Sequence, residues 1–446
     1  MLLLIVVFKV LLFSLKVIGH EERKPTVILI SFDGFRWNYL DNVETKTLSS
    51  LAKNGVKASV LNNFVTKTFP NHYSIVTGRY EENHGIINNR MWDPVYKEFF
   101  TMETVDPKWY NASEPLWITN QKAGDKRLSA VINWVGGSVP YHGQKAGFSP
   151  PYNSKLPFKE IVDIVLQQLT KDPPVNFVAM YFDEPDAVGH VFGPNSKEVV
   201  DAILKLDNVT GYLVDKLKKV DLFDKVNIIL TSDHGMTEIS PEKVIFLDDY
   251  ISRDKYELID SGVNSFIIPH EGETENVYKN LSNIPHMTAY HKEDIPSQWH
   301  YKNNRRVTPI FLACDLGYRI FQNISFVDSE KGAHGYNNSL KDMHPFFIAH
   351  GPAFKKNYNM SEFSIVHIYP LICHLLGVTP AENDGDLTAV LQMLSDINGS
   401  SFELLIFAMI ISGLVLMFMV YCLIRNCRKS SRVHYDVLDL ENILLS

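Results

Sequence analysis

Four short apolar runs, each ending in an aspartate or a glycine, constrain the fold of this chain more than any other sequence feature. They cover residues 25–33, 175–186, 226–235 and 309–315. Their β-branched and aromatic composition is typical of buried strands in a parallel sheet. Amphipathic helical patterns cover residues 158–171 and 196–220. Strands that alternate with helices predict an α/β domain, with a mostly parallel sheet and helices on both of its faces.

Acidic residues gather where these predicted strands end. They are Asp33, Asp183, Asp186, Asp233 and Asp315. In open α/β sheets, ligands bind outside the carboxyl ends of the strands. We therefore expect the functional site at this edge of the sheet.

The chain length indicates more than a single compact core. With 446 residues, the chain exceeds the size at which one core stops growing. Residues 90–155 are rich in Trp, Tyr, Pro and Gly and lack clear periodicity. We expect a large catalytic unit in which this region is an inserted loop region, or lobe.

Three histidines accompany the acidic residues. His234 directly follows Asp233, and His190 follows Asp186 by four residues, which places that pair on one face of a helical turn. His334 lies in the glycine-flanked segment KGAHGYNN. Taken singly, a turn aspartate or a solvated histidine is the commoner explanation for each residue. Together they suit two adjacent zinc sites with oxygen and nitrogen ligands, and four cysteines are too few for thiolate ligation.

Thr68 offers a nucleophile for such a site. It lies in the segment TKTFPNH, where Pro70 is expected to stop regular structure and fix the turn around the hydroxyl. A divalent cation would lower the pKa of that hydroxyl. The net charge of −8 argues against a partner that is a nucleic-acid polymer. A small anionic substrate is compatible with it, because bound metals reverse the local field.

Six motifs, in this order, resemble the ectonucleotide pyrophosphatase/phosphodiesterase family. They are SFDGFR, TKTFPNHYSIVTG, ENHGIINN, EPDAVGH, TSDHGM and AHGYNN, within about residues 25–380. The size and order resemble the short single-pass members of types 4 and 5. The resemblance implies an alkaline-phosphatase-like α/β core with two zinc ions. It assigns one zinc to Asp33, Thr68, Asp233 and His234, and the other to Asp186, His190 and His334.

The same resemblance implies the substrate contacts. Asn89 is expected to bind a phosphate oxygen beside the backbone amide of Thr68. Phe69 and Tyr152 are expected to sandwich a nucleobase, and packing of Phe69 in the core is the alternative. Ala333 and Asn337 stand where relatives commonly carry acids, which leaves the charge preference near that loop open. The chain also lacks the cysteines of the extracellular disulfides found in the short relatives.

The implied function is extracellular, zinc-dependent hydrolysis of nucleotide phosphodiester or pyrophosphate bonds. ATP, ADP, NAD and diadenosine polyphosphates are the expected substrates, and a phosphothreonine intermediate would release nucleoside 5′-monophosphates. One alternative is a phosphodiesterase for choline esters or lysophospholipids, with aromatic side chains around the choline. The other is a non-catalytic cell-surface receptor on the same fold.

Two apolar runs predict the topology. Residues 1–19 predict a secretory signal peptide, with an uncleaved anchor as the alternative because Lys9 interrupts the run. Residues 404–424 carry no charge and would form a helix about 31 Å long, which matches a bilayer. The basic residues after this run place the tail in the cytoplasm. The prediction is thus a signal peptide at 1–19, an extracellular domain at 20–380, a stalk at 381–403, a transmembrane helix at 404–424 and a cytoplasmic tail at 425–446.

Sequons and cysteines fit this topology. Candidate glycosylation sites are Asn111, Asn208, Asn280, Asn323, Asn337, Asn359 and Asn398. Cys314 and Cys373 are the two cysteines of the predicted ectodomain. One disulfide between them and burial as two free thiols are both open from the sequence.

Overall fold

The computed structural model describes residues 23–395, 413–414, 417–422 and 424–425. The chain divides into two units, Met1–Leu394 and Ser395–Ser446. In the second unit, residues 413–414, 417–422 and 424–425 are helical. Within the described ranges, no helix is both long enough and apolar enough to cross a membrane. The predicted signal peptide and most of the predicted transmembrane helix lie outside the described residues, and both stay predictions.

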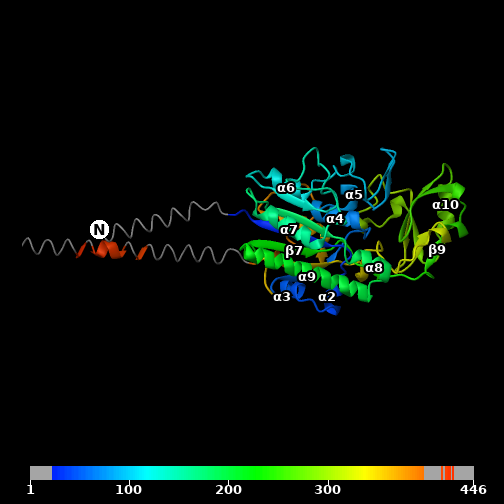
Figure 1. Ribbon diagram of the computed structural model, residues 1–446. Helices are drawn as coiled ribbons and strands as arrows, with labels where there is room; N and C mark the ends of the chain where they lie inside the picture. The colour runs from blue at the N-terminus through cyan, green and yellow to red at the C-terminus, as the bar shows by residue number, and fades with distance from the viewer. Residues whose placement is uncertain (1–22, 396–412, 415–416, 423, 426–446) are drawn as a thin grey trace, which may run out of the picture. The chain divides into compact units, whose positions relative to one another are not determined.

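The described part of the first unit is organised around an eight-stranded sheet (Figure 1). In spatial order its strands are β17 (Tyr358–Asn359), β2 (Val56–Leu61), β16 (Phe346–His350), β7 (Val226–Thr231), β1 (Thr26–Phe32), β6 (Phe177–Phe182) and β5 (Ser129–Ile132), with β18 (Phe363–Ser364) also pairing with β2. Strands β7, β1, β6 and β5 are parallel, whereas β16 is antiparallel to both β7 and β2. The predicted α/β class and mostly parallel sheet are confirmed.

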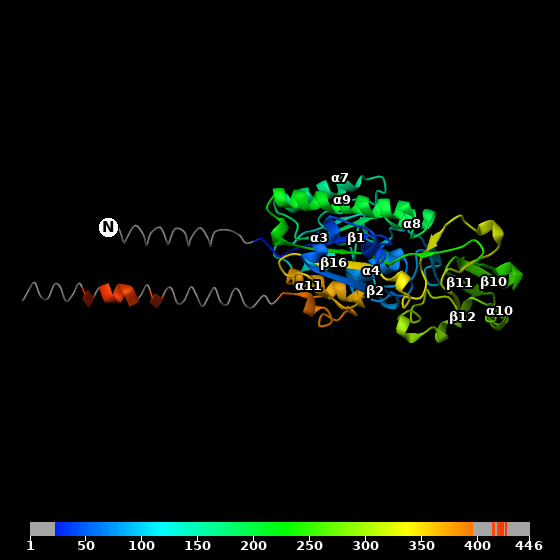
Figure 2. The ribbon, with the colours of Figure 1, turned by 90° about the horizontal axis from the view of Figure 1, so that it is seen from below.

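Helices cover both faces of this sheet (Figure 2). One face carries α2 (Tyr39–Asn42), α3 (Thr47–Lys53), α7 (Phe158–Thr170) and α9 (Lys197–Lys219), and the other carries α4 (Thr68–Thr77), α6 (Leu116–Lys122) and α11 (Ile368–Leu376). Successive residues of β1 alternate between the two cores: Val27 and Leu29 join one, Ile28 and Ile30 the other. This alternation explains why the run is apolar throughout.

The prediction for residues 309–315 was wrong in its placement. This run forms β13 (Ile310–Cys314), which belongs to a separate antiparallel sheet with β10 (Tyr256–Asp260), β11 (Asn264–Pro269) and β12 (Met287–His291). Helix α10 (Thr274–Leu281) packs beside β12 in this satellite sheet. Asp315 is exposed and pairs with His286 at 3.5 Å, so it contributes nothing to the site. A buried strand has the same composition in either kind of sheet.

Residues 90–155 are also more regular than predicted. They contain the hairpin of β3 (Met91–Asp93) and β4 (Glu98–Phe100), helix α6, and β5, which extends the central sheet. β5 was missed because its four residues give too short a periodic pattern.

The remaining α-helices and strands of the described residues are α5 (Glu81–His84), α8 (Asp186–Phe192), the pair β9 (Val244–Phe246) and β14 (Arg319–Phe321), and the pair β8 (Thr237–Glu238) and β15 (Gly332–Ala333).

The first unit extends beyond the predicted end of the domain at residue 380. Val390 and Met393, in the predicted stalk, are fully buried in the core beside α4 and α11. Cys314 and Cys373 are free, buried thiols in different hydrophobic clusters. Of the two alternatives for these cysteines, burial without a disulfide is therefore the one observed.

Candidate active site

Three neighbouring strands deliver the predicted ligands to one edge of the central sheet. Asp33 follows β1, Asp233 and His234 follow β7, and Asp186 begins α8 just after β6. Because β7, β1 and β6 are adjacent and parallel, their carboxyl ends meet at the same edge. The backbone amide of Asp186 also donates to the carbonyl of Asp33, at 3.0 Å. The structure thus brings these predicted ligands together at the edge of the sheet that the sequence indicates.

Thr68 is the first residue of helix α4, and its hydroxyl oxygen lies 3.3 Å from Nε2 of His234. The expectation that Pro70 stops regular structure was wrong, since Pro70 lies in the first turn of this helix. The first amide groups of a helix have no intrahelical acceptor, so a proline is tolerated there. The hydroxyl therefore lies at the positive end of a helix dipole, where an anion is stabilised.

In one group of ligands, the two carboxylates and the imidazole are completely enclosed, and Thr68 beside them is half-buried. Nε2 of His234 lies 3.0 Å from Oδ2 of Asp233 and 3.3 Å from Oδ1 of Asp33, and all three side chains are at most 3% exposed. Asp33, Asp233 and His72 also place ligand atoms within 4.8 Å of one another. We call Asp33, Thr68, Asp233 and His234 the buried group.

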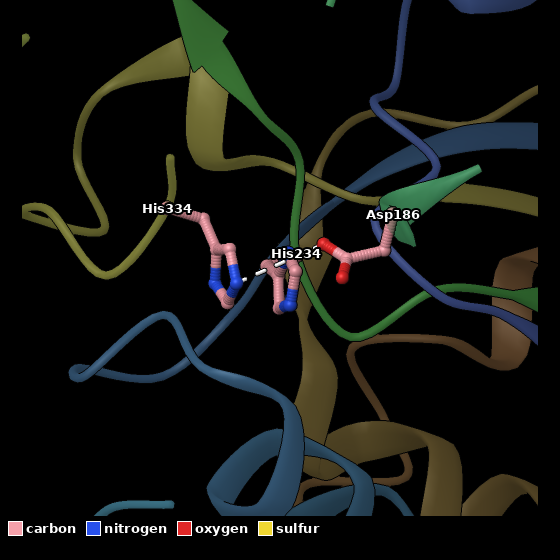
Figure 3. A group of neighbouring side chains, drawn as sticks. All are labelled: Asp186, His234 and His334. Atoms are coloured by element: carbon pink, nitrogen blue, oxygen red, sulfur yellow. Dashed lines mark ion pairs between the residues drawn. The ribbon is translucent and has the colours of Figure 1, made fainter. Parts of the chain in front are cut away.

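A second group lies beside it and is more open. Asp186 lies 3.5 Å from Nε2 of His190 and 3.7 Å from Nε2 of His334. The ring of His334 stacks on that of His234, with centroids 3.5 Å apart. Figure 3 shows the Asp186 carboxylate directed toward His234 and His334. We call Asp186, His190 and His334 the open group, and the stacked rings join both groups into one cluster.

Each of the three histidines has one ring nitrogen held by a backbone carbonyl. The Nδ1 atoms of His190, His234 and His334 lie 2.8–2.9 Å from carbonyl oxygens of Gly332, Gly235 and Thr66, respectively. A carbonyl accepts a hydrogen bond, so Nδ1 carries the proton of the neutral ring, and Nε2 of that neutral ring presents its lone pair to the cluster. Metal-binding histidines are oriented in this way.

The carboxylates also present unsatisfied acceptors. Oδ1 of Asp33, Oδ1 of Asp186 and Oδ2 of Asp233 are buried without a hydrogen-bond partner among the described residues. These oxygens face the imidazole lone pairs, and acceptors that face each other require a cation between them. The two triads found by geometry, Asp33–His72–Asp233 and Asp186–His234–His334, are consistent with a bimetallic site. The donor set therefore fits two divalent metal ions.

Electrostatics support the same conclusion. Burial raises the pKa of Asp33 well above its usual value, and the neighbouring Asp233 and Asp186 raise it further. Burial lowers the pKa of His334 well below its usual value, as do His234 and His190. Burial opposes a charge on His190, but Asp186 and Glu330 outweigh it and raise its pKa to about 9. The cluster concentrates negative charge that a bound cation would neutralise.

His72 is a site residue that the sequence prediction missed. It lies one helical turn after Thr68, its Nδ1 lies 2.9 Å from the Thr68 carbonyl and 3.3 Å from Oδ2 of Asp233, and its Nε2 lies 2.8 Å from Oγ of Ser31. Both ring nitrogens already have partners in the protein, so His72 positions Asp233 and the start of α4. Its spacing of four residues from Thr68 was a signal in the sequence.

The predicted substrate residues lie around the cluster. Oδ1 of Asn89 accepts a hydrogen bond from the backbone amide of Phe69, at 2.9 Å, which leaves its side-chain NH₂ available to an anion. The Phe69 ring packs edge-on against Phe100, with centroids 5.8 Å apart. Tyr152 is 57% exposed, in a small cavity shared with Asp183. Among the described residues, no ring contact joins Phe69 to Tyr152, so the sandwich stays a prediction.

The two departures from the family pattern take different places. Ala333 is buried in β15, next to His334. Asn337 is half-buried, and its side-chain oxygen accepts from the amide of Ser339 at 3.0 Å.

The predicted sequons differ in exposure. Asn208, Asn280 and Asn359 are exposed, Asn111, Asn323 and Asn337 are half-buried, and Asn398 lies outside the described residues.

Comparison with known proteins gives matches over most of the chain. Residues 27–337 match the family described as "Type I phosphodiesterase / nucleotide pyrophosphatase". The chain is 43% identical over 428 residues to human "Bis(5'-adenosyl)-triphosphatase ENPP4", which covers 95% of this chain and 93% of that protein. It is 42% identical over 380 residues to human "Ectonucleotide pyrophosphatase/phosphodiesterase family member 5", which covers 84% and 79%.

Solved structures of a relative are similar in fold. The murine ectonucleotide pyrophosphatase/phosphodiesterase 5 has been solved as an inactive threonine-to-alanine variant in complex with AMP. It superposes with a TM-score of 0.81 at 42% identity, and the match covers 83% of this chain and 100% of that chain. The human counterpart of that protein matches with the same TM-score.

Proposed function

The chain belongs to the type I phosphodiesterase/nucleotide pyrophosphatase family, and we propose that it hydrolyses diadenosine polyphosphates and related nucleotides outside the cell. The alkaline-phosphatase-like α/β fold expected from the sequence is confirmed, and so is membership of a hydrolase family. The observation that carries the proposal is the Thr68 hydroxyl, which lies at a helix N-terminus and 3.3 Å from His234 in the ligand cluster.

Two zinc ions are the proposed metals, because imidazole and carboxylate donors in an open site suit zinc. The buried group would hold one ion and the open group the other. When bound, the ions supply Lewis-acid stabilisation of the phosphate and of the attacking and leaving oxygens. Support comes from the oriented histidines and from the unsatisfied oxygens of Asp33, Asp186 and Asp233.

In the proposed reaction, the Thr68 hydroxyl gives its proton to a solvent water molecule and its oxygen attacks phosphorus. A bond forms between Oγ1 and phosphorus, the opposite phosphorus–oxygen bond breaks, and its electron pair leaves with the departing group. Water then cleaves the phosphothreonine and releases a nucleoside 5′-monophosphate. The inactive threonine variant of the murine relative supports an essential threonine.

Asn89 and the start of α4 would stabilise the phosphate. The Asn89 oxygen is occupied by the Phe69 amide, so its NH₂ group is oriented to donate to a phosphate oxygen. The positive end of α4 adds to this stabilisation. Together they would fix the phosphate for attack by Thr68.

The nucleoside half would bind through Phe69 and Tyr152, with the base stacked on their rings. The AMP complex of the murine relative supports a nucleotide substrate, and the name of the human triphosphatase favours a diadenosine polyphosphate over ATP, ADP or NAD.

The ectonucleotide names of relatives support an extracellular domain. We propose anchoring by one helix at 404–424 and glycosylation at the exposed sequons.

The test is a substrate and zinc panel on the full-length chain. We expect hydrolysis of the p-nitrophenyl ester of AMP and of diadenosine triphosphate, loss of both activities after chelation, and recovery with zinc. Thr68→Ala should lower the rate by about 10⁴-fold with normal zinc content. The control Thr288→Ala, at an exposed position of β12, should be unchanged.

Three results would contradict the proposal. Full activity of Thr68→Ala excludes this residue as the nucleophile. Turnover of glycerophosphocholine without turnover of either nucleotide would instead establish the alternative of a phosphodiesterase for choline esters. Inactivity of the zinc-loaded wild type toward all three esters would support a receptor.

A further inference from the structure

A cavity of about 230 Å³ opens beside the open group. His190, His334 and Asn89 form its inner wall, while Thr68 and the carboxylates of the buried group are not part of its lining. The outer wall comes from the segment after β10 and from β14 with the loop that follows it. The cavity therefore begins at the ligands that lie farther from the nucleophile.

The direction of attack indicates which part of the substrate would reach this cavity. In an in-line displacement the attacking and leaving oxygens lie on opposite sides of phosphorus, and two-metal sites clamp one oxygen at each ion. Thr68 contacts His234 of the buried group. The leaving oxygen must then lie toward the open group, and the rest of the leaving group must extend past His190 and His334.

Two basic side chains line the cavity there. Lys67 is 12% exposed and lies 3.3 Å from Oδ2 of Asp260, an oxygen that also accepts from the side-chain amide of Asn88 at 2.7 Å. An ammonium group has three donors, so Lys67 has donors beyond this long contact. It precedes the nucleophile in the sequence and lines the cavity.

Arg319 is the second basic residue, and it is 3% exposed. Its Nη1 donates to Oδ1 of Asp328 at 2.6 Å and lies 3.5 Å from Glu330. Its Nε–H group is buried without a hydrogen-bond partner among the described residues. An unsatisfied buried donor on a cavity wall indicates a missing acceptor, and a phosphate oxygen matches a guanidinium geometrically.

With the two basic residues, the acidic side chains on the outer wall form a set of contacts that suits a nucleotide. Asp328 and Glu330 are 43% and 38% exposed, so they remain accessible to a ligand that fills the cavity. Carboxylates accept hydrogen bonds from ribose hydroxyls in nucleotide sites. They also offset the positive charge of the wall, so the cavity suits ADP better than pyrophosphate, which carries more negative charge and has no ribose hydroxyls to donate to the carboxylates.

We propose that this cavity holds the nucleoside phosphate leaving group, with its phosphates against Lys67 and Arg319 and its ribose hydroxyls against Asp328 and Glu330. The inference rests on the proposed function, because it takes Thr68 as the nucleophile. Negative charge grows on the leaving phosphate as the bond to phosphorus breaks, so contacts with Arg319 strengthen in the transition state. The cavity thus selects dinucleotides over nucleoside triphosphates.

The experiment compares substrates that share the attacked adenylyl half. Diadenosine triphosphate releases ADP, ATP releases pyrophosphate, and the p-nitrophenyl ester of AMP releases a phenolate without phosphate or ribose. Arg319→Gln should lower kcat/KM for diadenosine triphosphate by about 10- to 100-fold and change that of the p-nitrophenyl ester by less than about threefold. The matched control is Arg253→Gln, an exposed arginine paired with Asp248.

Asp328→Asn gives an independent readout, because the side chain is 43% exposed and the asparagine keeps an oxygen that can accept from Arg319. It should lower kcat/KM for diadenosine triphosphate, because a ribose contact is weakened. It should raise kcat/KM for ATP, because a negative charge near the pyrophosphate is removed. The crossing of these two effects is specific to a leaving-group site.

A binding measurement separates the cavity from the chemistry. In the Thr68→Ala background, adding Arg319→Gln should weaken equilibrium binding of diadenosine triphosphate by about tenfold and leave AMP binding unchanged. Equal losses of activity on all three substrates, or equal binding of diadenosine triphosphate, would overturn the cavity proposal. Wild-type inactivity toward the p-nitrophenyl ester would instead refute the proposed function, so the two failures are distinguishable.

Discussion

The buried group and the open group both contain aspartate and histidine ligands but are built from different parts of the fold. Asp33, Asp233 and His234 follow the two central strands β1 and β7, and their side chains are at most 3% exposed. His190 comes from the seven-residue helix α8, and His334 comes from a loop after the short strand β15. Asp186 and His190 are 17% and 24% exposed.

This difference separates two tasks within one site. The strands that carry the buried group are packed on both faces of the sheet, so its side chains are held in place. This suits a nucleophile that must keep one geometry through every turnover. The open group borders the cavity, through which a leaving group departs and water arrives. Enclosure at one group and access at the other therefore match the two halves of the proposed reaction.

Chemical rescue is the most direct test of this difference in access between the two groups. We expect His234→Gly and His190→Gly each to lose about 10³-fold in kcat/KM, since either change removes a nitrogen ligand from a site that supplies several kcal/mol. Added imidazole should restore His190→Gly by about tenfold, because this side chain is 24% exposed and lines the cavity. The His234 side chain is completely buried, so imidazole should leave that variant unchanged.

The control for rescue is His142→Gly, at an exposed position whose backbone φ of 44° already suits glycine. This variant should match the wild type with and without imidazole. Rescue of His234→Gly to the same degree as His190→Gly would show that both groups are accessible, and the division of tasks would be lost.

Sequence reasoning found the buried group for a physical reason. Short apolar runs that end in polar residues locate β1 and β7, and these parallel strands bring Asp33, Asp233 and His234 together. The same reasoning misplaced β13, because pairing partners are chosen by contacts between distant segments that no local pattern records. It also missed β5, whose four residues are too few for a period.

The parts of the site that the sequence left open depend on distant contacts. His72 gains its role from Asp233 and Ser31, which lie far from it in the chain. Arg319 and Glu330 carry no motif, and the fold alone brings them beside His190. The proposed role of Asn89 came from the family resemblance, and the 2.9 Å bond to the Phe69 amide adds its orientation.

Asn89 accepts from the amide of Phe69, next to Thr68, and lines the cavity beside the open group, so it tests whether the two groups act on one phosphate. Asn89→Ala should lower kcat by about 10²-fold with little change in KM, because a donor to the transition state is lost. The effect should be equal for diadenosine triphosphate and for the p-nitrophenyl ester, since both share the attacked phosphate. Asn303→Ala, an exposed asparagine, is the control, and a loss confined to diadenosine triphosphate would place Asn89 with the leaving group instead.

The smallest expected effects concern the base, which lies on neither side of the reacting bond. Tyr152→Ala should raise KM for the AMP ester by about 5- to 100-fold, as expected for one stacking contact of roughly 1–3 kcal/mol. Its melting temperature should not change, because the side chain is 57% exposed. Bis(p-nitrophenyl) phosphate, which has no base, should be hydrolysed as by the wild type.

Phe69→Ala separates stacking from packing, because this ring is half-buried against Phe100. It should raise KM for the AMP ester and also lower stability, by less than the roughly 3–5 kcal/mol of a fully buried phenylalanine. A stability loss without any change in KM would assign Phe69 to the core, which was the structural alternative from the sequence. The base would then rest on Tyr152 alone, and selectivity among nucleotides would depend more strongly on the cavity beside the open group.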